Sequence, residues 1–195
     1  MLQRFIFWFM STWFYKRICC WVVRTIRLPI LRGRFSADEI RHIESLLRPG
    51  DILLVNNPWK LQSWMIPGRY EHGAMVVDKT VAETEIGEMT AEGYGTVEFK
   101  EWLRQYTTIV VLRVKTWDTE YTEQVVHVVQ SLVGTPYDDQ FVLGPEAVYC
   151  FELCVIGDID NRLEFKPKKL VGLERLYVDG DCLADSHDVE VIYKR

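Results

Sequence analysis

Short apolar runs bounded by turn-forming residues are the main pattern in the first half of this chain. They occupy residues 51–55, 72–77, 80–86 and 107–114. Each run has the length of a strand and is too short for a typical helix. Helical patterns lie before and after these runs. This order of elements predicts an α+β domain in which a small antiparallel sheet packs on helices.

The globular domain is expected to begin with a helix at Ser36. Ser36 and Glu39 form a capping-box pattern, and Pro49-Gly50 ends the helical stripe that follows. We therefore expect one domain over residues 35–195 and a separate arm over residues 1–34. Further helices are expected at 97–105, 120–133 and 146–156, and later elements near 170–177 and 189–193.

The arm, residues 1–34, is aromatic and strongly basic, and we expect it to be helical. It holds seven Lys and Arg residues and no acidic one, so it carries +7 and leaves −12 for the rest of a chain whose net charge is −5. Its longest uncharged run, 5–15, is too short to span a bilayer, which needs about 20 residues. Two interpretations stay open: a helix in the interface of an anionic membrane, or a helix that docks on the domain or on a partner protein.

Localisation therefore stays open between a peripheral membrane position and membership of a larger assembly. No specific nucleic acid partner is expected. The five cysteines give no sign of a disulfide framework or a zinc site, because their number is odd and none of them form a CxxC pair. We expect no metal and no cofactor. The cysteines are Cys19, Cys20, Cys150, Cys154 and Cys182.

Cys150 is the cysteine whose position favours a chemical role. It follows Gly144-Pro145 and lies in the first turns of an apolar helical pattern. Backbone N–H groups and the helix dipole stabilise a thiolate near the N-terminus of a helix. The same N–H groups can bind the oxyanion of a tetrahedral intermediate. Cys154, one turn later, is expected to be a packed core thiol.

His72 is the candidate base for this thiol. It opens a strand whose remaining residues are apolar, and Gly73 leaves space beside it. An imidazole in that position can accept the proton of Cys150 and give it to a leaving group. A third group usually orients such a ring. Glu83 and Glu85 share one face of the next run by strand alternation, so either can supply the carboxylate.

Six segments of the chain resemble a known family when they are taken in order. They are Pro49–Leu54, Tyr70–Gly73 with its apolar strand, the strand with an acid, Phe99–Leu103, Gly134–Asp138 and Tyr149–Leu153. Together they resemble the circularly permuted branch of the NlpC/P60 superfamily of papain-like cysteine hydrolases. This branch includes YiiX-type bacterial proteins, poxvirus relatives and the lecithin:retinol acyltransferase group. The resemblance covers residues 49–157, with the histidine ahead of the cysteine.

The resemblance implies a permuted papain-like NlpC/P60 fold and a triad of cysteine, histidine and a third polar residue. It assigns the triad to Cys150, His72 and Glu83, with Glu85 as the alternate acid. Phe151 stands where many YiiX-type members have Ser, so a more apolar pocket wall is expected. Substrate contacts are expected from Tyr137, Tyr149, Trp59 and Trp64.

Members of the branch cleave amide bonds or transfer acyl groups of lipids through a thioester. The resemblance therefore implies a cysteine hydrolase that acts on the amide of a peptide, an isopeptide or a cell-wall peptide. Two alternatives stay open. One is a lipid acyl hydrolase or acyltransferase at a membrane, which the basic aromatic arm favours. The other is a non-enzymatic papain-like subunit of a larger assembly, because a fold does not fix a function.

Overall fold

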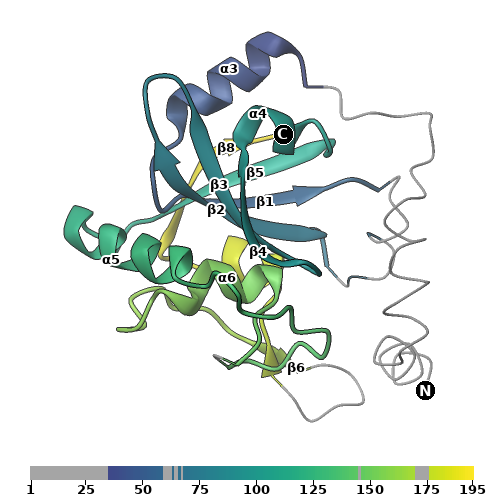
Figure 1. Ribbon diagram of the computed structural model, residues 1–195, viewed down its shortest axis with the longest axis vertical. Coiled ribbons are helices and arrows are strands. Elements are labelled where there is room, and N and C mark those ends of the chain that lie inside the picture. Colours follow the sequence, from purple (N-terminus) through teal and green to yellow (C-terminus); the bar gives the residue numbers. More distant parts are fainter. Residues whose placement is uncertain (1–34, 59–62, 64–65, 67, 145, 170–175) are drawn as a thin grey trace.

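A six-stranded antiparallel sheet forms the centre of the protein (Figure 1). The computed structural model describes residues 35–58, 63, 66, 68–144, 146–169 and 176–195. The strand order is β4-β3-β2-β1-β5-β8, and every neighbouring pair is antiparallel. The strands are β1 (Ile52–Asn56), β2 (His72–Lys79), β3 (Thr84–Thr90), β4 (Gly93–Glu98), β5 (Thr108–Val114) and β8 (Val189–Lys194).

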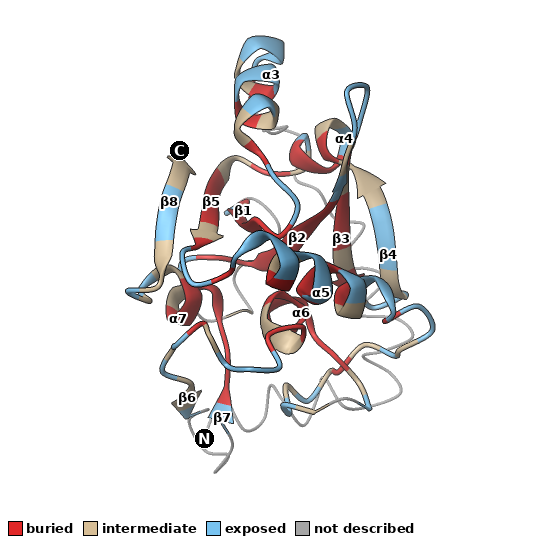
Figure 2. Cartoon of the chain, turned by 90° about the vertical axis from the view of Figure 1, so that its left-hand side faces the viewer, coloured by how far each residue is buried: buried red, intermediate tan, exposed pale blue. Residues whose placement is uncertain are grey.

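Helices cover both faces of this sheet, as Figures 1 and 2 show. On one face lie α3 (Ala37–Leu46) and α4 (Phe99–Leu103), and on the other lie α5 (Thr119–Gln130) and α6 (Cys150–Ile156). The tail adds a short hairpin and a short helix: β6 (Lys168–Lys169), β7 (Leu176–Tyr177) and α7 (Gly180–Ala184). The α+β class expected from the sequence is confirmed, with an antiparallel sheet between helices.

Two hydrophobic clusters, one on each face of the sheet, make up the core. Along β1, Ile52 and Leu54 belong to the cluster under α5 and α6, whereas Leu53 and Val55 belong to the cluster under α3 and α4. Strand alternation sends successive side chains to opposite faces, so a central strand covered on both sides must be apolar throughout. This explains why β1 reads as an unbroken apolar run.

The capping box expected at the first helix of the domain is confirmed. The Ser36 hydroxyl accepts a hydrogen bond from the Glu39 N–H at 3.2 Å, and the Ser36 N–H donates to Glu39 Oε2 at 2.8 Å. The arm, residues 1–34, lies outside the described residues. Within the described part of the chain, no helix is long and apolar enough to cross a membrane.

Several elements differ from their expected bounds, and local hydrogen bonds explain two of the differences. Thr80 and Glu83 close a turn, since the Thr80 N–H donates to the Glu83 carbonyl, so β3 begins only at Thr84. The helix expected at 146–156 begins at Cys150 because the backbone around Val148 is extended and bridges to Tyr137. β4 and α7 have no counterpart among the elements expected from the sequence.

Candidate active site

Cys150 is the first residue of α6, and the residue before it is fixed in the core. Tyr149 has an extended backbone and serves as the N-cap of the helix. Its side chain is fully buried, and its hydroxyl accepts a hydrogen bond from the Val178 N–H at 2.7 Å. The Cys150 side chain is itself buried. The helix start therefore holds the thiol in one position.

Close packing of α6 on β2 brings this thiol to the strand that begins with His72. A Cβ atom on Gly73 would lie 2.8 Å from the Phe151 ring and 3.3 Å from the Cys150 carbonyl oxygen. The Cys154 thiol also lies 3.7 Å from the Ala74 carbonyl oxygen. Only a glycine at position 73 permits this approach of helix and strand. Cys154 is a packed core thiol, as expected.

The His72 ring is held by a carboxylate and two aromatic residues. His72 Nε2 lies 2.7 Å from Glu88 Oε2, and the same oxygen accepts a hydrogen bond from Trp102 Nε1 at 3.0 Å. The Tyr106 ring stacks on the imidazole at 6.3 Å between centroids and 14° between planes. Because Glu88 engages Nε2, the other ring nitrogen is left for Cys150.

The protonation state of His72 follows from these partners. Burial lowers the pKa of the imidazole, because a low-dielectric environment disfavours the charged form. Hydrogen bonds with Cys150 and Glu88, together with the charges of these groups, act in the opposite direction and raise the pKa of His72 to about 10. The structure therefore brings Cys150 and His72 within hydrogen-bonding reach and favours a proton on the imidazole.

Tyr137 is the next residue beside the thiol. Burial raises the pKa of its hydroxyl well above the ordinary value, and the charge of Cys150 and a hydrogen bond with Cys150 raise it further. The phenol therefore keeps its proton and can donate it toward the sulfur. The backbone of Tyr137 bridges to Val148, two residues before Cys150. Of the expected substrate contacts that the structure describes, Tyr137 is the one whose hydroxyl forms a hydrogen bond with the Cys150 side chain.

The structure assigns the carboxylate next to His72 to Glu88, and this corrects the expectation of Glu83 or Glu85. Glu83 is exposed in the turn between β2 and β3. Glu85 pairs with Asp78 near the far end of β2, about six strand residues or 20 Å from His72. Glu88 pairs with Ala74, so strand alternation places it on the same face as His72.

Of the other expected substrate contacts, the structure corrects one and does not describe two. Tyr149 does not line an open surface; it is a core residue that fixes the start of α6. Trp59 and Trp64 lie outside the described residues. Trp102 and Tyr106, which hold the His72 ring, were not among the expected site residues. Helical spacing does not indicate this pair, because α4 ends at Leu103, before Tyr106.

Two buried carboxylates fix the loop that leads to Cys150. Asp138 accepts the N–H groups of Gln140, at 2.7 Å, and of Val142. Glu152, two residues after the thiol, accepts the Gly144 N–H at 2.7 Å. Burial raises the pKa of Glu152 to about 7, although the Gly144 and Tyr149 N–H groups lower it. This loop is therefore a fixed part of the site.

One group of described residues could hold a metal ion, and it includes neither Cys150 nor His72. The ligand atoms of Glu164, His187 and Asp188 are all within 4.8 Å of one another. Both Asp188 oxygens already have neighbours, since one accepts the Glu164 N–H at 2.9 Å and the other lies 3.3 Å from His187 Nε2. Glu164 and His187 are exposed. This group takes no part in the reaction proposed below.

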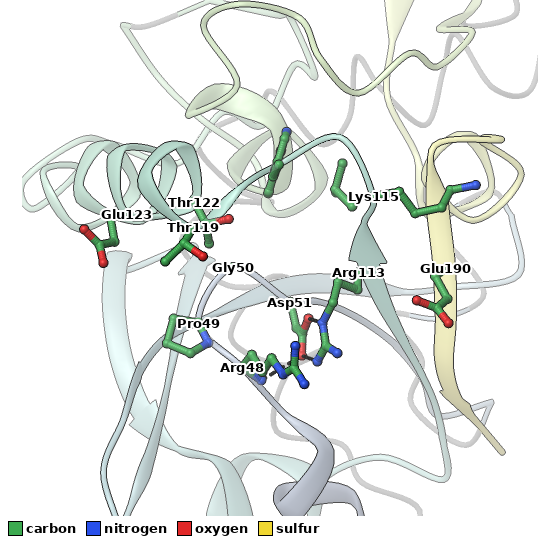
Figure 3. Close-up of a pocket in the computed structure, with 12 residues that line it drawn as sticks. Arg48, Pro49, Gly50, Asp51, Arg113, Lys115, Thr119, Thr122, Glu123 and Glu190 are labelled. Carbon is green, nitrogen blue, oxygen red and sulfur yellow. Dashed lines mark hydrogen bonds and ion pairs between the residues drawn. The ribbon is translucent and has the colours of Figure 1, made fainter.

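A pocket of about 450 Å³ near the start of β1 is separate from the thiol site (Figure 3). Figure 3 shows Arg113 directed at Asp51, and Arg113 Nε and Nη2 each lie 2.7 Å from an Asp51 oxygen. His72 pairs with Val55 at the other end of β1. The pair of buried Asp51 and partly buried Arg113 ties the residue before β1 to β5.

The fold and the site together define a class of protein. A thiol at the start of a helix, packed on a strand that begins with a carboxylate-bound imidazole, is the arrangement of a papain-like enzyme; here the histidine precedes the cysteine. The sequence profile of the family described as "Permuted papain-like amidase enzyme, YaeF/YiiX, C92 family" matches residues 46–179, and the chain belongs to this family.

A solved structure has the same fold. It is the crystal structure of the metalloprotein yiiX from Escherichia coli O157:H7, with a TM-score of 0.65 and 18% sequence identity. The match covers 76% of this chain and 97% of that one. A comparison with curated proteins gives no match. The permuted papain-like fold expected from the sequence is confirmed.

Proposed function

We propose that the protein is a cysteine hydrolase that cleaves an amide bond through a thioester on Cys150. Membership of a permuted papain-like amidase family supports this proposal. The observation that carries it is the His72 ring, which interacts with Glu88 on one side and with Cys150 on the other. A buried imidazole with a raised pKa beside a thiol is the pairing that produces a nucleophilic thiolate.

The reaction uses these groups in turn. The Cys150 sulfur bonds to the carbonyl carbon while the thiol proton lies on His72. The C–N bond breaks, His72 gives its proton to the leaving amine, and a thioester remains on Cys150. A water molecule then attacks the thioester carbonyl and gives a proton to His72. The C–S bond then breaks, the carboxylic acid leaves, and His72 returns a proton to the Cys150 sulfur, which restores the thiol.

Glu88 and Tyr137 have supporting roles in this proposal. Glu88 is a positioning residue, because it accepts the His72 Nε2–H and is itself held by Trp102. Tyr137 offers a protonated hydroxyl next to the sulfur, and the Cys150 N–H has no partner within its own helix because it belongs to the first turn. Both can donate to the oxyanion of the tetrahedral intermediate.

Site-resolved alkylation tests the proposal. We expect iodoacetamide at neutral pH to label Cys150 of the full chain much faster than Cys182, whose pKa burial raises to about 11. His72→Ala should slow the labelling of Cys150 at least about tenfold, because it removes the group that holds the proton. Mass spectrometry of tryptic peptides gives both rates.

Two results would count against the proposal. If Cys150 and Cys182 are labelled at the same rate, Cys150 is not an activated thiol, and a non-enzymatic subunit becomes the better interpretation. If His72→Ala leaves Cys150 labelling unchanged while the fold persists by circular dichroism, another group activates the thiol. Acyl transfer to a second substrate would appear as a new ester or amide product in place of the free acid.

A further inference from the structure

Glu152 is a buried carboxyl group that the proposed reaction does not use. It is 4% exposed and stands in the first turn of α6, two residues after the nucleophile. Its Oε1 accepts a hydrogen bond from the Gly144 N–H at 2.7 Å. Its Oε2 is buried and has no hydrogen-bond partner within the described part of the chain. Burying a charged carboxylate in this way is unfavourable, so the presence of a glutamate here needs an explanation.

The position of Glu152 connects the nucleophile helix with the loop before it. With Tyr149 as the N-cap, Glu152 is the third residue of α6, from which a glutamate side chain can reach back toward the N-cap. The Gly144 N–H lowers the pKa of Glu152, and the Tyr149 N–H acts in the same direction. One carboxyl group therefore interacts with the end of the loop and with the residue directly before Cys150.

The loop that Glu152 holds has a backbone conformation that is rare for a bulky residue. The φ of Phe141 is 54°, in the left-handed region. Its ring packs on Tyr149 at 5.2 Å between centroids, and Asp138 accepts the N–H groups of the residues on either side of it. Such a conformation persists only where the surroundings enforce it. The hydrogen bond from Gly144 to Glu152 attaches the end of this loop to α6.

The charge on Glu152 changes near neutral pH. Burial, together with the charge of Asp138, raises its pKa to about 7 against the effect of the two N–H groups. Burial also raises the pKa of the Tyr149 hydroxyl, and the Glu152 charge adds to this effect. The other elements packed on α6 carry ionisable side chains, but none of those described acts on the Glu152 pKa, including His72 of β2, Glu88 of β3 and Tyr121 of α5. The carboxyl is therefore protonated at mildly acidic pH and ionised at mildly alkaline pH.

The two protonation states hold the loop with different strength. A hydrogen bond to an ionised acceptor is roughly twice as strong as one to a neutral acceptor. The ionised carboxylate therefore binds the Gly144 N–H more tightly than the protonated acid does. A glutamine would offer the same acceptor without burying a charge. The property that a glutamate adds at this position is a charge that depends on pH.

We propose that Glu152 is a pH-responsive positioning residue, whose ionised carboxylate holds the loop on the first turn of α6 and keeps the Cys150 sulfur at the His72 ring. Protonation weakens this hold, and Cys150 becomes less reactive. This inference rests on the proposed function, because it concerns the reactivity of the same thiol. It adds a regulation near neutral pH that His72 does not supply, since the pKa of His72 is about 10.

Iodoacetamide labelling of Cys150 in the full chain, from mildly acidic to mildly alkaline pH, tests this inference. We expect a step near pH 7 in which the labelling rate rises. A rise of about fivefold corresponds to the difference between a charge-assisted and a neutral hydrogen bond. Glu152→Gln imitates the protonated acid and should lack this step. It should match the original chain at acidic pH and label more slowly at alkaline pH.

Asp158→Asn is the matched control. Asp158 is a buried carboxylate just beyond the other end of α6, where it accepts the N–H groups of Arg162 and Leu163. Its replacement should lower the stability of the fold and leave the step in the Cys150 profile at the same pH. Circular dichroism shows whether each variant is folded.

Asp138→Asn is a second variant that reaches Glu152 through its charge. Burial is the larger influence on the Glu152 pKa, but the Asp138 charge also raises it. Its loss should therefore move the step in Cys150 labelling to lower pH. A step that stays at the same pH in this variant would mean that a group other than Glu152 titrates.

Other results would also overturn the inference and leave the proposed function intact. One is a Glu152→Gln profile with the same step as the original chain. Another is a labelling rate that Glu152→Gln lowers by the same factor at every pH, because a purely structural contact does not respond to pH. Equal labelling of Cys150 and Cys182 in the original chain would instead overturn the proposed function, and this inference with it.

Discussion

At the scale of single residues, the chemistry depends on where one proton lies. His72 interacts with Glu88 and with Cys150, and its ring stacks on Tyr106. Burial alone would keep this imidazole neutral. The raised pKa, about 10, means that the two partners outweigh burial. Glu88 and Cys150 therefore both favour a proton on His72.

Replacing Glu88 by Gln should shift the pH dependence of hydrolysis. The variant keeps an acceptor for Trp102 but removes the negative charge that raises the His72 pKa. A nearby carboxylate is typically worth about 1–3 pKa units. The Glu88 carboxylate raises the pKa of His72, so its loss should lower that pKa. The alkaline limb of the kcat/KM profile, where His72 loses its proton, should therefore move to lower pH by about one unit or more.

The control for this prediction is Glu83→Gln. Glu83 is exposed in a turn at the other end of β2, so its replacement should leave the profile unchanged. Profiles are measured with the acetyl ester of 4-nitrophenol, whose leaving group needs little acid assistance, and with an anilide, which needs more. If the alkaline limb lies at the same pH in Glu88→Gln and in the original chain, Glu88 does not position His72.

The sequence predicted the pair of Cys150 and His72, but it did not predict the carboxylate that holds the His72 ring. Cys150 and His72 were expected to become neighbours, and the structure brings them within hydrogen-bonding reach. Glu88 was missed because its placement depends on strand register. The turn at Thr80–Glu83 delays β3, and only the pairing of Ala74 with Glu88 puts this carboxylate beside His72. Local pattern does not contain cross-strand register.

At the scale of elements, the packing of α6 on β2 sets the distance between Cys150 and His72. Cys150 and His72 belong to different elements, and at Gly73 the two elements pack too closely to leave room for a Cβ atom. A side chain there would push the helix from the strand by a few tenths of an ångström or more. Cores resist such changes, because side chains interdigitate at high density.

Gly73→Ala should damage both stability and reactivity. The new Cβ would lie 2.8 Å from Phe151 Cδ1 and 3.2 Å from the Cys154 sulfur. Overpacking of this kind costs about 1–3 kcal/mol in the free energy of unfolding. We also expect the alkylation rate of Cys150 to fall at least about tenfold, since the thiol moves from His72. Urea denaturation and site-resolved iodoacetamide labelling give the two quantities.

Gly95→Ala supplies the comparison, because a Cβ at Gly95 in β4 meets nothing within 4 Å. Its effect on the free energy of unfolding should stay within about 0.5 kcal/mol, and Cys150 labelling should not change. If Gly73→Ala changes stability and labelling as little as Gly95→Ala does, α6 and β2 can accommodate an added methyl group. Close packing at Gly73 then does not set the geometry of the site.

Element types followed from the sequence more readily than element ends. β1, β2 and β5 were expected because their β-branched and apolar runs have the length of strands. β4 was missed, since Gly93-Tyr94-Gly95 weakens the pattern and no residue of this edge strand is fully buried. α6 starts later than expected because the bridge between Val148 and Tyr137 competes with the helix.

At the scale of the whole molecule, charge is divided between two parts of the chain. Residues 1–34 carry +7, and the rest carries −12. An acidic domain is repelled by an anionic surface, so any attraction to such a surface must come from the arm. A peripheral membrane position is therefore our proposal for the arm.

Vesicle flotation of the full chain tests the role of the arm. We expect co-flotation with vesicles that contain phosphatidylserine, and little with pure phosphatidylcholine. Each basic residue near an anionic surface is worth about 1 kcal/mol. Replacing Lys16, Arg17, Arg24 and Arg27 by Gln should therefore weaken partitioning by roughly a thousandfold, and high salt should weaken it similarly, because screening acts on exposed charges.

The matched control removes the same charge from the domain. Arg41, Arg104, Lys166 and Lys169 are exposed there, and their replacement by Gln should leave partitioning nearly unchanged. If the two variants lose binding equally, net charge alone is responsible and the arm has no special role. If the full chain does not float with anionic vesicles at all, the membrane interpretation fails. A partner protein is then the remaining explanation for a basic, aromatic segment attached to an acidic hydrolase domain.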